Sequence, residues 1–236
     1  LAQQSLDLGK KANLPLQIAG GYQILSYSQI EAGKYREAFR HLRFILDFNE
    51  ISDSYHHQLP RLLNQMGYLY LELGDAETAL CWDGRAVESS RSSPGTSNFE
   101  MQRYSLLKWA TDYLYLGKIE EAMESVAQFE AIKEAPFFTH YRYFNRFLLL
   151  MAELQLALND PSEAIGFARE ARTFARNNKA VKNIAKGYWV EGQSLSRMSK
   201  NREAVQLLEE AVQLADEIRH GSLRWKIRLD IAQAQI

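Results

Sequence analysis

The sequence has little of several features that would indicate a function directly. Its 236 residues include one cysteine, Cys81, so no disulfide can form within the chain, as is usual in a reducing compartment. Lys and Arg (28) nearly balance Asp and Glu (29), so the overall charge indicates neither nucleic acid nor an anionic membrane as partner. The longest apolar stretch, 147–158, is interrupted by Glu153 and Gln155 and is too short to span a bilayer. We therefore expect a cytoplasmic protein that contacts neither nucleic acid nor membrane.

The sequence also lacks motifs of enzymes and cofactor sites. It contains no phosphate-binding glycine loop, zinc-protease helix, nucleophile elbow or paired-cysteine motif. His56 and His57, with Asp53 nearby, form the only cluster with ligand chemistry, and their spacing does not converge on a metal. We expect them to be ordinary loop or helix-start residues. The sequence predicts no catalytic residue, no metal site and no cofactor.

A repeat is what the sequence does contain. Five times, a small residue is followed five positions later by alanine, and the first members of successive pairs lie 41, 43, 42 and 40 residues apart. The pairs are Gly33/Ala38, Gly74/Ala79, Gly117/Ala122, Asn159/Ala164 and Ser199/Ala204. Such a period indicates one supersecondary unit that is copied and stacked.

Each copy is expected to be a helical hairpin with one apolar side. In the second copy, Gly74 closes the first helix in the left-handed conformation, and Asp75 caps the second helix through its carboxylate. In the fourth copy, Asn159, Asp160 and Pro161 are expected to turn the chain, cap the helix and begin it. A single hairpin cannot bury its apolar side, whereas stacked hairpins can.

The chain resembles the tetratricopeptide repeat (TPR) family in the residues of these hairpins. The second copy carries Leu63, Met66, Gly67, Tyr70, Gly74, Ala79 and Ala86; the third carries Leu106, Trp109, Ala110, Tyr113, Gly117 and Ala122; the fifth carries Tyr188, Gly192, Leu195, Ala204 and Ala211. The resemblance implies an all-α fold, a right-handed superhelical solenoid of antiparallel helical hairpins with about twelve helices.

The organisation of the chain follows from the repeat. We expect a single solenoid with a half repeat at 1–13, repeats at about 14–50, 57–92, 99–135, 138–178 and 181–220, and a half repeat at 222–236. Neither end has the polar capping repeat with which solenoids close, so we expect a fragment of a larger protein. The average period of about 41 residues exceeds the family's typical value of about 34. In this the chain is similar to the repeats of MalT-like signal-transduction ATPases and to peptide receptors of the Rap and PlcR type.

The resemblance also implies a binding site. In TPR proteins the first helices line a concave groove, and the corresponding positions here hold Tyr27, Arg61, Asn64, Tyr68, Tyr104, Leu107, Thr111, Tyr115, Arg146, Leu149 and Trp189. Some relatives hold peptide C-termini with a clamp of Lys, Asn and Arg; those positions here hold Gln23, Tyr27, Gln65, Tyr104 and Lys108, so that clamp is absent. We expect the groove to bind an extended peptide or a protein helix. The alternative is that these side chains pack against neighbouring hairpins.

Two further segments each allow two interpretations. Six aromatic residues crowd 137–147 (Phe137, Phe138, Tyr141, Tyr143, Phe144 and Phe147), and packing over the core is favoured over a ligand platform. The basic series is Arg169, Arg172, Arg176, Lys179, Lys182 and Lys186. A solvated outer face, partly paired with Glu209, Glu210, Asp216 and Glu217, is favoured over a surface for an acidic partner.

These observations predict a non-catalytic module that binds a protein or peptide within a larger signalling or transcriptional regulator. The alternative is a sensor domain that binds a small-molecule effector or signalling peptide and controls an attached ATPase, cyclase or DNA-binding domain. Both functions use the repeated surface of stacked hairpins, and neither requires a catalytic constellation.

Overall fold

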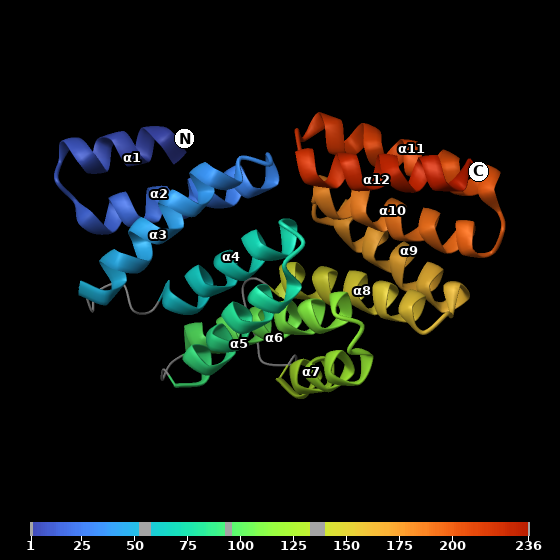
Figure 1. Cartoon of the computed structure of the whole chain (residues 1–236), viewed down its shortest axis with the longest axis horizontal. Coiled ribbons are helices and arrows are strands. Elements are labelled where there is room, and N and C mark those ends of the chain that lie inside the picture. The colour runs from blue at the N-terminus through green and yellow to red at the C-terminus, as the bar shows by residue number, and fades with distance from the viewer. Residues whose placement is uncertain (1, 52–57, 93–95, 133–139, 236) are drawn as a thin grey trace. The chain divides into compact units, whose positions relative to one another are not determined.

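The computed structural model describes residues 2–51, 58–92, 96–132 and 140–235, which form twelve helices and no strand (Figure 1). The helices are α1 (Ala2–Lys11), α2 (Pro15–Glu31), α3 (Tyr35–Ile51), α4 (Leu59–Glu72), α5 (Ala76–Ser92), α6 (Thr96–Tyr115), α7 (Ile119–Ile132), α8 (His140–Ala157), α9 (Pro161–Asn177), α10 (Val181–Arg197), α11 (Asn201–Glu217) and α12 (Gly221–Ala234). The all-α fold predicted from the repeat is confirmed.

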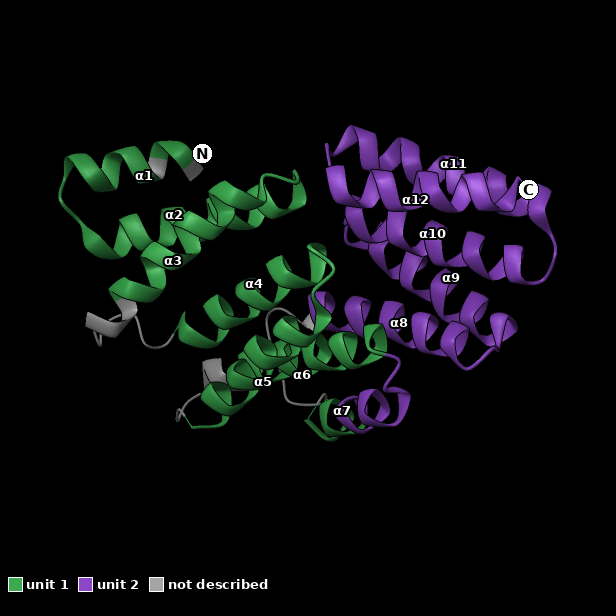
Figure 2. Ribbon diagram, in the orientation of Figure 1, with its two compact units in different colours: residues 1–116, 127–135 green, residues 117–126, 136–236 purple. Residues whose placement is uncertain are grey.

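The chain divides into two compact units (Figure 2). Unit 1 comprises 1–116 and 127–135, and unit 2 comprises 117–126 and 136–236. In unit 1, α2 packs on α3, α4 on α5 and α5 on α6; the first helices α2 and α4, and α4 and α6, also contact each other. In unit 2, each helix from α8 to α12 packs on the next, and α10 additionally contacts α8 and α12. The first helices of successive hairpins therefore lie side by side within each unit.

The five small residues of the repeat all occupy the left-handed region of backbone conformation. Their φ angles are 78° at Gly33, 84° at Gly74, 71° at Gly117, 62° at Asn159 and 59° at Ser199. At Gly74 the turn closes with two backbone hydrogen bonds. The N–H of Asp75 donates to Tyr70 O (2.9 Å), and that of Gly74 donates to Leu71 O (3.1 Å). This is the Schellman arrangement, and it confirms the predicted turn within each hairpin.

A second set of left-handed residues joins one hairpin to the next. Asn13, Lys179 and Arg219 have φ angles of 50°, 54° and 55°, and each lies between a second helix and the following first helix. The N–H of Ala180 donates to Ala175 O (2.9 Å), which is the same closing bond as within the hairpins. Lys179 and Arg219 are not residues that usually favour a left-handed turn, so the repeat pattern alone did not reveal their joints.

The predicted helix caps form where a carboxylate follows the turn. Asp75 Oδ1 accepts from the N–H of Thr78 at 3.0 Å, and Asp160 Oδ1 accepts from that of Glu163 at 3.0 Å. These bonds satisfy backbone donors that a helix start leaves unpaired. The hydrogen bond from Thr78 also holds the pKa of the Asp75 carboxyl below its usual range. In α11 the equivalent residue is Lys200, whose side chain makes no such bond.

The alanines that follow the turns mark the closest helix contacts. Ala38, Ala79, Ala122, Ala164 and Ala204 have no accessible surface. The core of unit 1 includes Leu42, Ile45, Leu62 and Met66, and that of unit 2 includes Leu208, Ala211, Leu223 and Ile227. A side chain larger than methyl at the alanine positions would have to displace a neighbouring helix. The repeat therefore places one tight joint in each hairpin.

Candidate functional site

The predicted groove residues lie on the first helices of the hairpins, as the TPR register requires. Those of unit 1 are Tyr27 on α2; Arg61, Asn64 and Tyr68 on α4; and Tyr104, Leu107, Thr111 and Tyr115 on α6. Those of unit 2 are Arg146 and Leu149 on α8 and Trp189 on α10. Each unit thus presents its own part of the candidate surface.

Accessibility divides the predicted residues of unit 1 into three groups. Arg61 and Tyr115 are exposed, Tyr27, Tyr68, Tyr104 and Thr111 are half-buried, and Asn64 and Leu107 are buried. The side chain of Tyr115 keeps 50% of its surface accessible, whereas Asn64 and Leu107 keep none. The exposed and half-buried residues are therefore the part of this set that a partner can reach.

Aromatic and cationic side chains meet on the first helices of unit 1. The ring centroids of Tyr27 on α2 and Tyr68 on α4 lie 5.7 Å apart. The ammonium of Lys108 on α6 lies 4.9 Å from the centroid of the Tyr68 ring, within cation–π range. The structure thus brings Tyr27 and Tyr68 together and adds Lys108 to them.

A buried polar network lies beneath this surface. Asp83 on α5 is fully buried, and its Oδ1 accepts from Asn64 Nδ2 at 2.7 Å. Asn64 Oδ1 in turn accepts from Ser105 Oγ at 2.9 Å, and Lys108 Nζ lies 3.9 Å from Asp83 Oδ2. A buried carboxylate is costly without such partners. Asn64 therefore links α4, α5 and α6, and it offers no surface to a ligand.

Gly67 makes room for this network. A β-carbon on Gly67 would lie 2.5 Å from the carboxylate of Asp83, closer than carbon and oxygen atoms can approach. The sequence shows Asp83 at a position where the family usually has an apolar residue. That departure was the one signal of the network, because its partners come from two other helices.

The two glutamines at predicted clamp positions are buried. Gln23 and Gln65 are 7% and 6% exposed, and Gln65 Nε2 donates to the backbone oxygen of Gln23 at 3.2 Å. This bond joins α2 to α4. These positions serve packing between first helices, which agrees with the absence of the clamp inferred from the sequence.

In unit 2 the predicted residues have unequal access. Leu149 is buried, whereas Arg146 and Trp189 are half-buried. Trp189 Nε1 on α10 donates to Asp230 Oδ2 on α12, and Gln193 Nε2 donates to the same oxygen at 2.8 Å. This face of α10 therefore turns toward α12.

Glu153 is the acid on the same face of α8. It lies seven residues after Arg146, on one side of the helix. Glu153 is half-buried and is surrounded largely by protein atoms. This desolvation raises the pKa of its carboxyl, while the charges of Lys186, Lys226 and Arg146 act in the opposite direction. One acid thus feels cations from three successive first helices.

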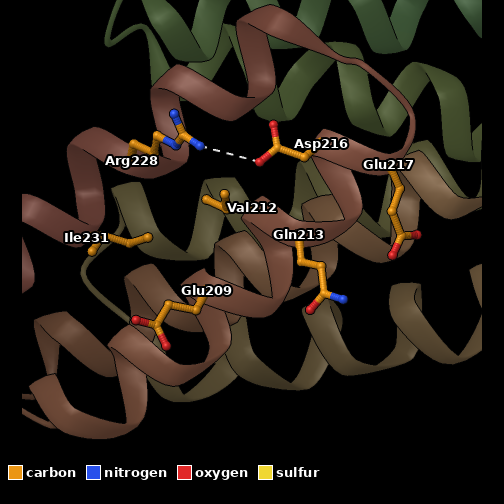
Figure 3. A pocket seen from close by; sticks show the side chains of 7 residues that line it. All are labelled: Glu209, Val212, Gln213, Asp216, Glu217, Arg228 and Ile231. Atoms are coloured by element: carbon orange, nitrogen blue, oxygen red, sulfur yellow. Dashed lines mark hydrogen bonds and ion pairs between the residues drawn. The ribbon is translucent and has the colours of Figure 1, made fainter.

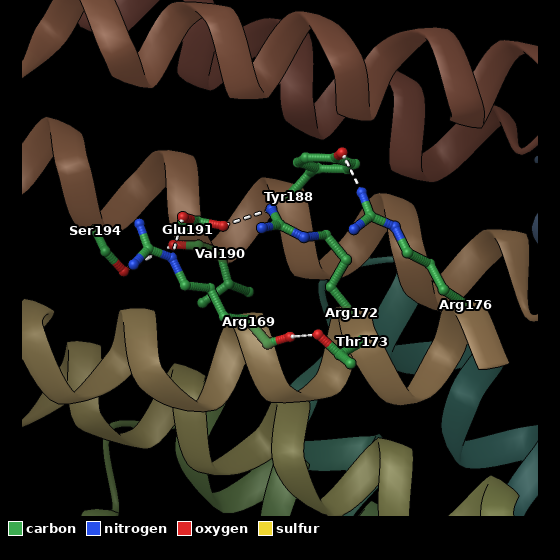
Figure 4. Close-up of polar contacts among 8 residues, drawn as sticks. All are labelled: Arg169, Arg172, Thr173, Arg176, Tyr188, Val190, Glu191 and Ser194. Carbon is green, nitrogen blue, oxygen red and sulfur yellow. Dashed lines mark hydrogen bonds and ion pairs between the residues drawn. The ribbon is translucent and has the colours of Figure 1, made fainter.

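The three arginines of the basic series contact residues of α10. Arg169 Nε and Arg172 Nη1 donate to the two oxygens of Glu191 at 2.7 and 2.5 Å (Figure 4). Glu191 lies on α10 and is 3% exposed. The guanidinium of Arg172 also covers the ring of Tyr188 at 4.2 Å, and Arg176 Nη2 donates to the Tyr188 hydroxyl at 2.6 Å. These arginines join α9 to α10.

The partial pairing of this series with the acidic residues of α11 does not include Arg169 and Arg172. Their carboxylate is Glu191, because α9 packs on α10 and places both guanidinium groups over it. Asp216 on α11 is instead paired with Arg224 (3.1 Å) and Arg228 (3.4 Å) on α12. Both pairings join residues on different helices, so the spacing of these residues in the sequence did not predict them.

The described part of the aromatic run packs as favoured. Tyr143 and Phe147 are 5% and 8% exposed. Phe144 is half-buried, and its ring centroid lies 5.1 Å from that of Phe174 on α9. Phe137 and Phe138 lie outside the described residues. Phe144 therefore holds α8 against α9, while the half-buried Tyr141 accepts a hydrogen bond from Arg142 Nε at 2.9 Å.

A pocket opens between α11 and α12. It has a volume of about 490 Å³ and is lined by Glu209, Val212, Gln213, Asp216, Glu217, Arg228 and Ile231 (Figure 3). The Asp216–Arg228 pair crosses it, and its charged lining residues are three carboxylates and one guanidinium. No residue predicted for the groove lies in this pocket.

The described residues contain no group of three or more His, Cys, Asp or Glu side chains that could hold a metal ion. His56, His57 and Asp53 lie outside the described residues. Cys81 is exposed on α5. No helix in the described part of the chain is both long and apolar enough to cross a membrane.

Comparison with known proteins identifies one family. The family model described as "Anaphase-promoting complex subunit 5" matches residues 24–187 and 194–223, which is most of the chain. A search of curated proteins found no match. The family match includes helices of both units and most of the predicted groove positions.

Solved structures share the fold at low sequence identity. BtubC (BKLC) from P. vanneervenii is 13% identical with a TM-score of 0.62, and the match covers 92% of this chain and 89% of that one. A kinesin light chain from Podospora anserina with nearly identical TPR-like repeats is 15% identical with a TM-score of 0.51, covering 83% and 93%. These likenesses show a TPR-like helical repeat fold.

Proposed function

We propose that this chain, which belongs to the anaphase-promoting complex subunit 5 family, is a non-catalytic module that binds a protein or peptide segment. The family match carries the proposal, because the family is named after a subunit of a complex. The fold supports it, since stacked helical hairpins offer extended surfaces on which partners bind.

The first helices are the binding surface in this proposal. In unit 1 it comprises Tyr27, Tyr68, Tyr104 and Tyr115, with Arg61 and Thr111 beside them. In unit 2 it comprises Arg146 and Trp189. Tyr, Trp and Arg dominate the energy of protein interfaces because they combine a large apolar area with hydrogen-bonding groups. An extended peptide or a helix suits such a surface better than a small anion does.

The proposal also places the module in a larger cytoplasmic signalling or transcriptional regulator. The long repeat period and the similarity to MalT-like repeats support this context. Binding on the first helices would bias the packing of neighbouring hairpins, and small rotations of packed helices are one way such a change is transmitted.

Capture of partners followed by a single-residue test addresses the proposal. The intact chain is used to isolate a partner, whose binding to purified chain is then measured by calorimetry. Tyr115→Ala is expected to weaken that binding by about 1–3 kcal/mol, the cost of truncating an interface aromatic. Phe44→Ala is the control, since Phe44 is 47% exposed on the second helix α3. Circular dichroism of both variants should match the native chain.

Three outcomes contradict the proposal. If Tyr115→Ala binds the partner as tightly as the native chain does, the predicted groove is not the binding surface. A saturable thermal shift with one metabolite, in a chain that captures no protein, replaces the module with a sensor of a small molecule. Turnover of a substrate by the isolated chain would make it an enzyme.

A further inference from the structure

Three basic residues recur at one position of successive hairpins in unit 2. Arg146 on α8, Lys186 on α10 and Lys226 on α12 follow one another at intervals of 40 residues. The same interval separates the turn residues Asn159 and Ser199, so the three side chains occupy equivalent places in their helices. We name Arg146, Lys186 and Lys226 the basic row. All three side chains are half-buried.

The basic row lies on one continuous face. The helix α10 contacts both α8 and α12, so it is the direct neighbour of each. Glu153 is close enough to feel the charge of all three cations. The hydrogen bond of Trp189 to Asp230 shows that the face of α10 that carries Lys186 turns toward α12, because Trp189 lies three residues after Lys186 on that face. The repeat thus assembles a row of charge from separate helices.

The starts of these helices make the face more positive. The first turns of α8, α10 and α12 contain no acidic residue, whereas α9 and α11 carry Glu163 and Glu203 there. Arg142 and Lys182 lie one turn before Arg146 and Lys186, near the helix N-termini. A cation at that end adds to the positive end of the helix dipole and gains no stabilisation from it. Folding alone does not favour this placement.

We propose that the basic row binds an acidic segment of a partner protein, which extends the function proposed above and rests on it. The carboxylates of such a segment would pair with Arg146, Lys186 and Lys226, three cations on a face that also carries the acids Glu153 and Asp230. Apolar side chains of the segment would contact Trp189, which is half-buried, and Leu229, which is 51% exposed. Trp189 and Leu229 each lie three residues after a member of the row.

Charge balance favours a peptide over nucleic acid. The net charge of the whole chain is −1, and Asp230 and Glu153 share the face with the cations. Glu209 and Glu210 are exposed on α11 of the same unit. A long phosphate backbone would meet this negative charge, and nucleic-acid-binding domains usually carry a net basic excess. A short acidic segment can pair with the basic row without reaching the acidic residues around it.

The test uses the intact chain and two labelled peptides in fluorescence anisotropy. One peptide alternates Glu and Leu, and its control alternates Gln and Leu. We expect the acidic peptide to bind more tightly, and Lys186→Gln to weaken that binding about three- to tenfold through loss of one charge contact. Lys200→Gln, which removes an exposed cation at the start of α11, should change it less than about twofold. Glu153→Gln should strengthen binding, because it removes the acid that competes with the peptide.

Several results would overturn the inference. These are equal binding of the two peptides, equal loss in Lys186→Gln and Lys200→Gln, and displacement of the acidic peptide by a lower concentration of single-stranded oligonucleotide. Lys226→Gln serves as a second variant of the row if Lys186→Gln does not fold by circular dichroism. If Tyr115→Ala loses an isolated partner while Lys186→Gln and Lys226→Gln retain it, the basic row is excluded and the proposed function stands.

Discussion

The hairpins α4–α5 and α10–α11 have the same backbone plan but opposite chemistry at their centres. Gly67 and Gly192 each lie seven residues before their turn residue, and Asp83 and Leu208 lie nine residues after it. A β-carbon on Gly67 would meet the Asp83 carboxylate at 2.5 Å, and one on Gly192 would meet Leu208 Cγ at 2.7 Å. The close approach is therefore a property of the repeat, while the polarity of the side chain that fills it is not.

The following first helix differs in the same sense. Lys108 on α6 and Asp230 on α12 occupy matching positions, as do Asn64 on α4 and Trp189 on α10. Lys108 and Asn64 serve the carboxylate of Asp83, whereas Asp230 accepts from the Trp189 indole. Residues that touch across helices thus differ together between the hairpins. Each joint pairs its polar side chains across neighbouring helices, and the backbone tolerates either solution.

The largest expected effect comes from breaking the charged joint. Lys108→Leu leaves the buried Asp83 without the ammonium that lies 3.9 Å away. The free energy of unfolding should fall by about 3–5 kcal/mol, the usual cost of removing one partner of a buried ion pair. Urea denaturation followed by circular dichroism measures it. The double variant Asp83→Leu/Lys108→Leu makes this joint apolar, as Leu208 makes the joint of α10–α11, and should recover most of the lost free energy of unfolding. Additive losses would show that the two residues do not act as a pair.

Adding a methyl group to either glycine tests whether the close approach is shared. Gly67→Ala and Gly192→Ala should each lower the free energy of unfolding by about 1–3 kcal/mol through overpacking. Gly166→Ala is the control in α9, since nothing lies within 4 Å of the added carbon. That variant should be more stable than the native chain because alanine favours the helix. Stability equal to Gly166→Ala in either test variant would mean that its joint relaxes freely.

A third difference between the hairpins is the cap, and it can be transferred. Lys200→Asp places a carboxylate where α5 has Asp75, and we expect a gain of about 1 kcal/mol. Asp75 has a lowered pKa, so its capping contribution is present at neutral pH and is lost as the pH falls below about 4. The gain in Lys200→Asp should disappear over the same range. Thermal denaturation at pH 7 and pH 3 checks this, and Lys200→Ala separates the new cap from the lost cation.

The smallest effect is expected at the turn residue. Ser199 adopts a φ of 59°, where a β-carbon is unfavourable, whereas α4–α5 has Gly74 at that point. Ser199→Gly should raise stability by about 0.5 kcal/mol, because relief of strain exceeds the entropy that glycine adds to the unfolded chain. Gly74→Ser should lower it. Differential scanning calorimetry measures the change in melting temperature. A lower melting temperature for Ser199→Gly would contradict the claim that the backbone is strained at Ser199.

Local features were predictable from the sequence because they depend on residues close together in the chain. The turn at Asn159, the cap at Asp160 and the buried Ala164 all follow from a few neighbouring letters. The helix pairs follow too, since a repeat can bury its apolar side in few ways. The joint at Lys179 was missed because a lysine there is unlike the residues that usually favour a left-handed turn.

Long-range pairs were not predictable in the same way. Glu191 lies 22 residues from Arg169, and Asp83 lies 25 residues from Lys108, so each pair depends on how helices pack. Asn64 was predicted for the groove but is buried, because its amide donates a hydrogen bond to the buried carboxylate of Asp83. Leu107 and Leu149 are apolar, and burying them is favourable. The TPR register placed the helix faces, whereas side-chain chemistry decided which residues remained accessible.

The joints at Lys179 and Arg219 share one backbone geometry and lie 40 residues apart. Excising 180–219 would therefore connect α9 to α12 through an equivalent turn, and inserting a further copy would extend the array without a new connector. The joints within hairpins at Asn159 and Ser199 have the same property. A helix pair could therefore be gained or lost at either of two kinds of joint. Duplication need not respect hairpin boundaries to yield a chain that folds.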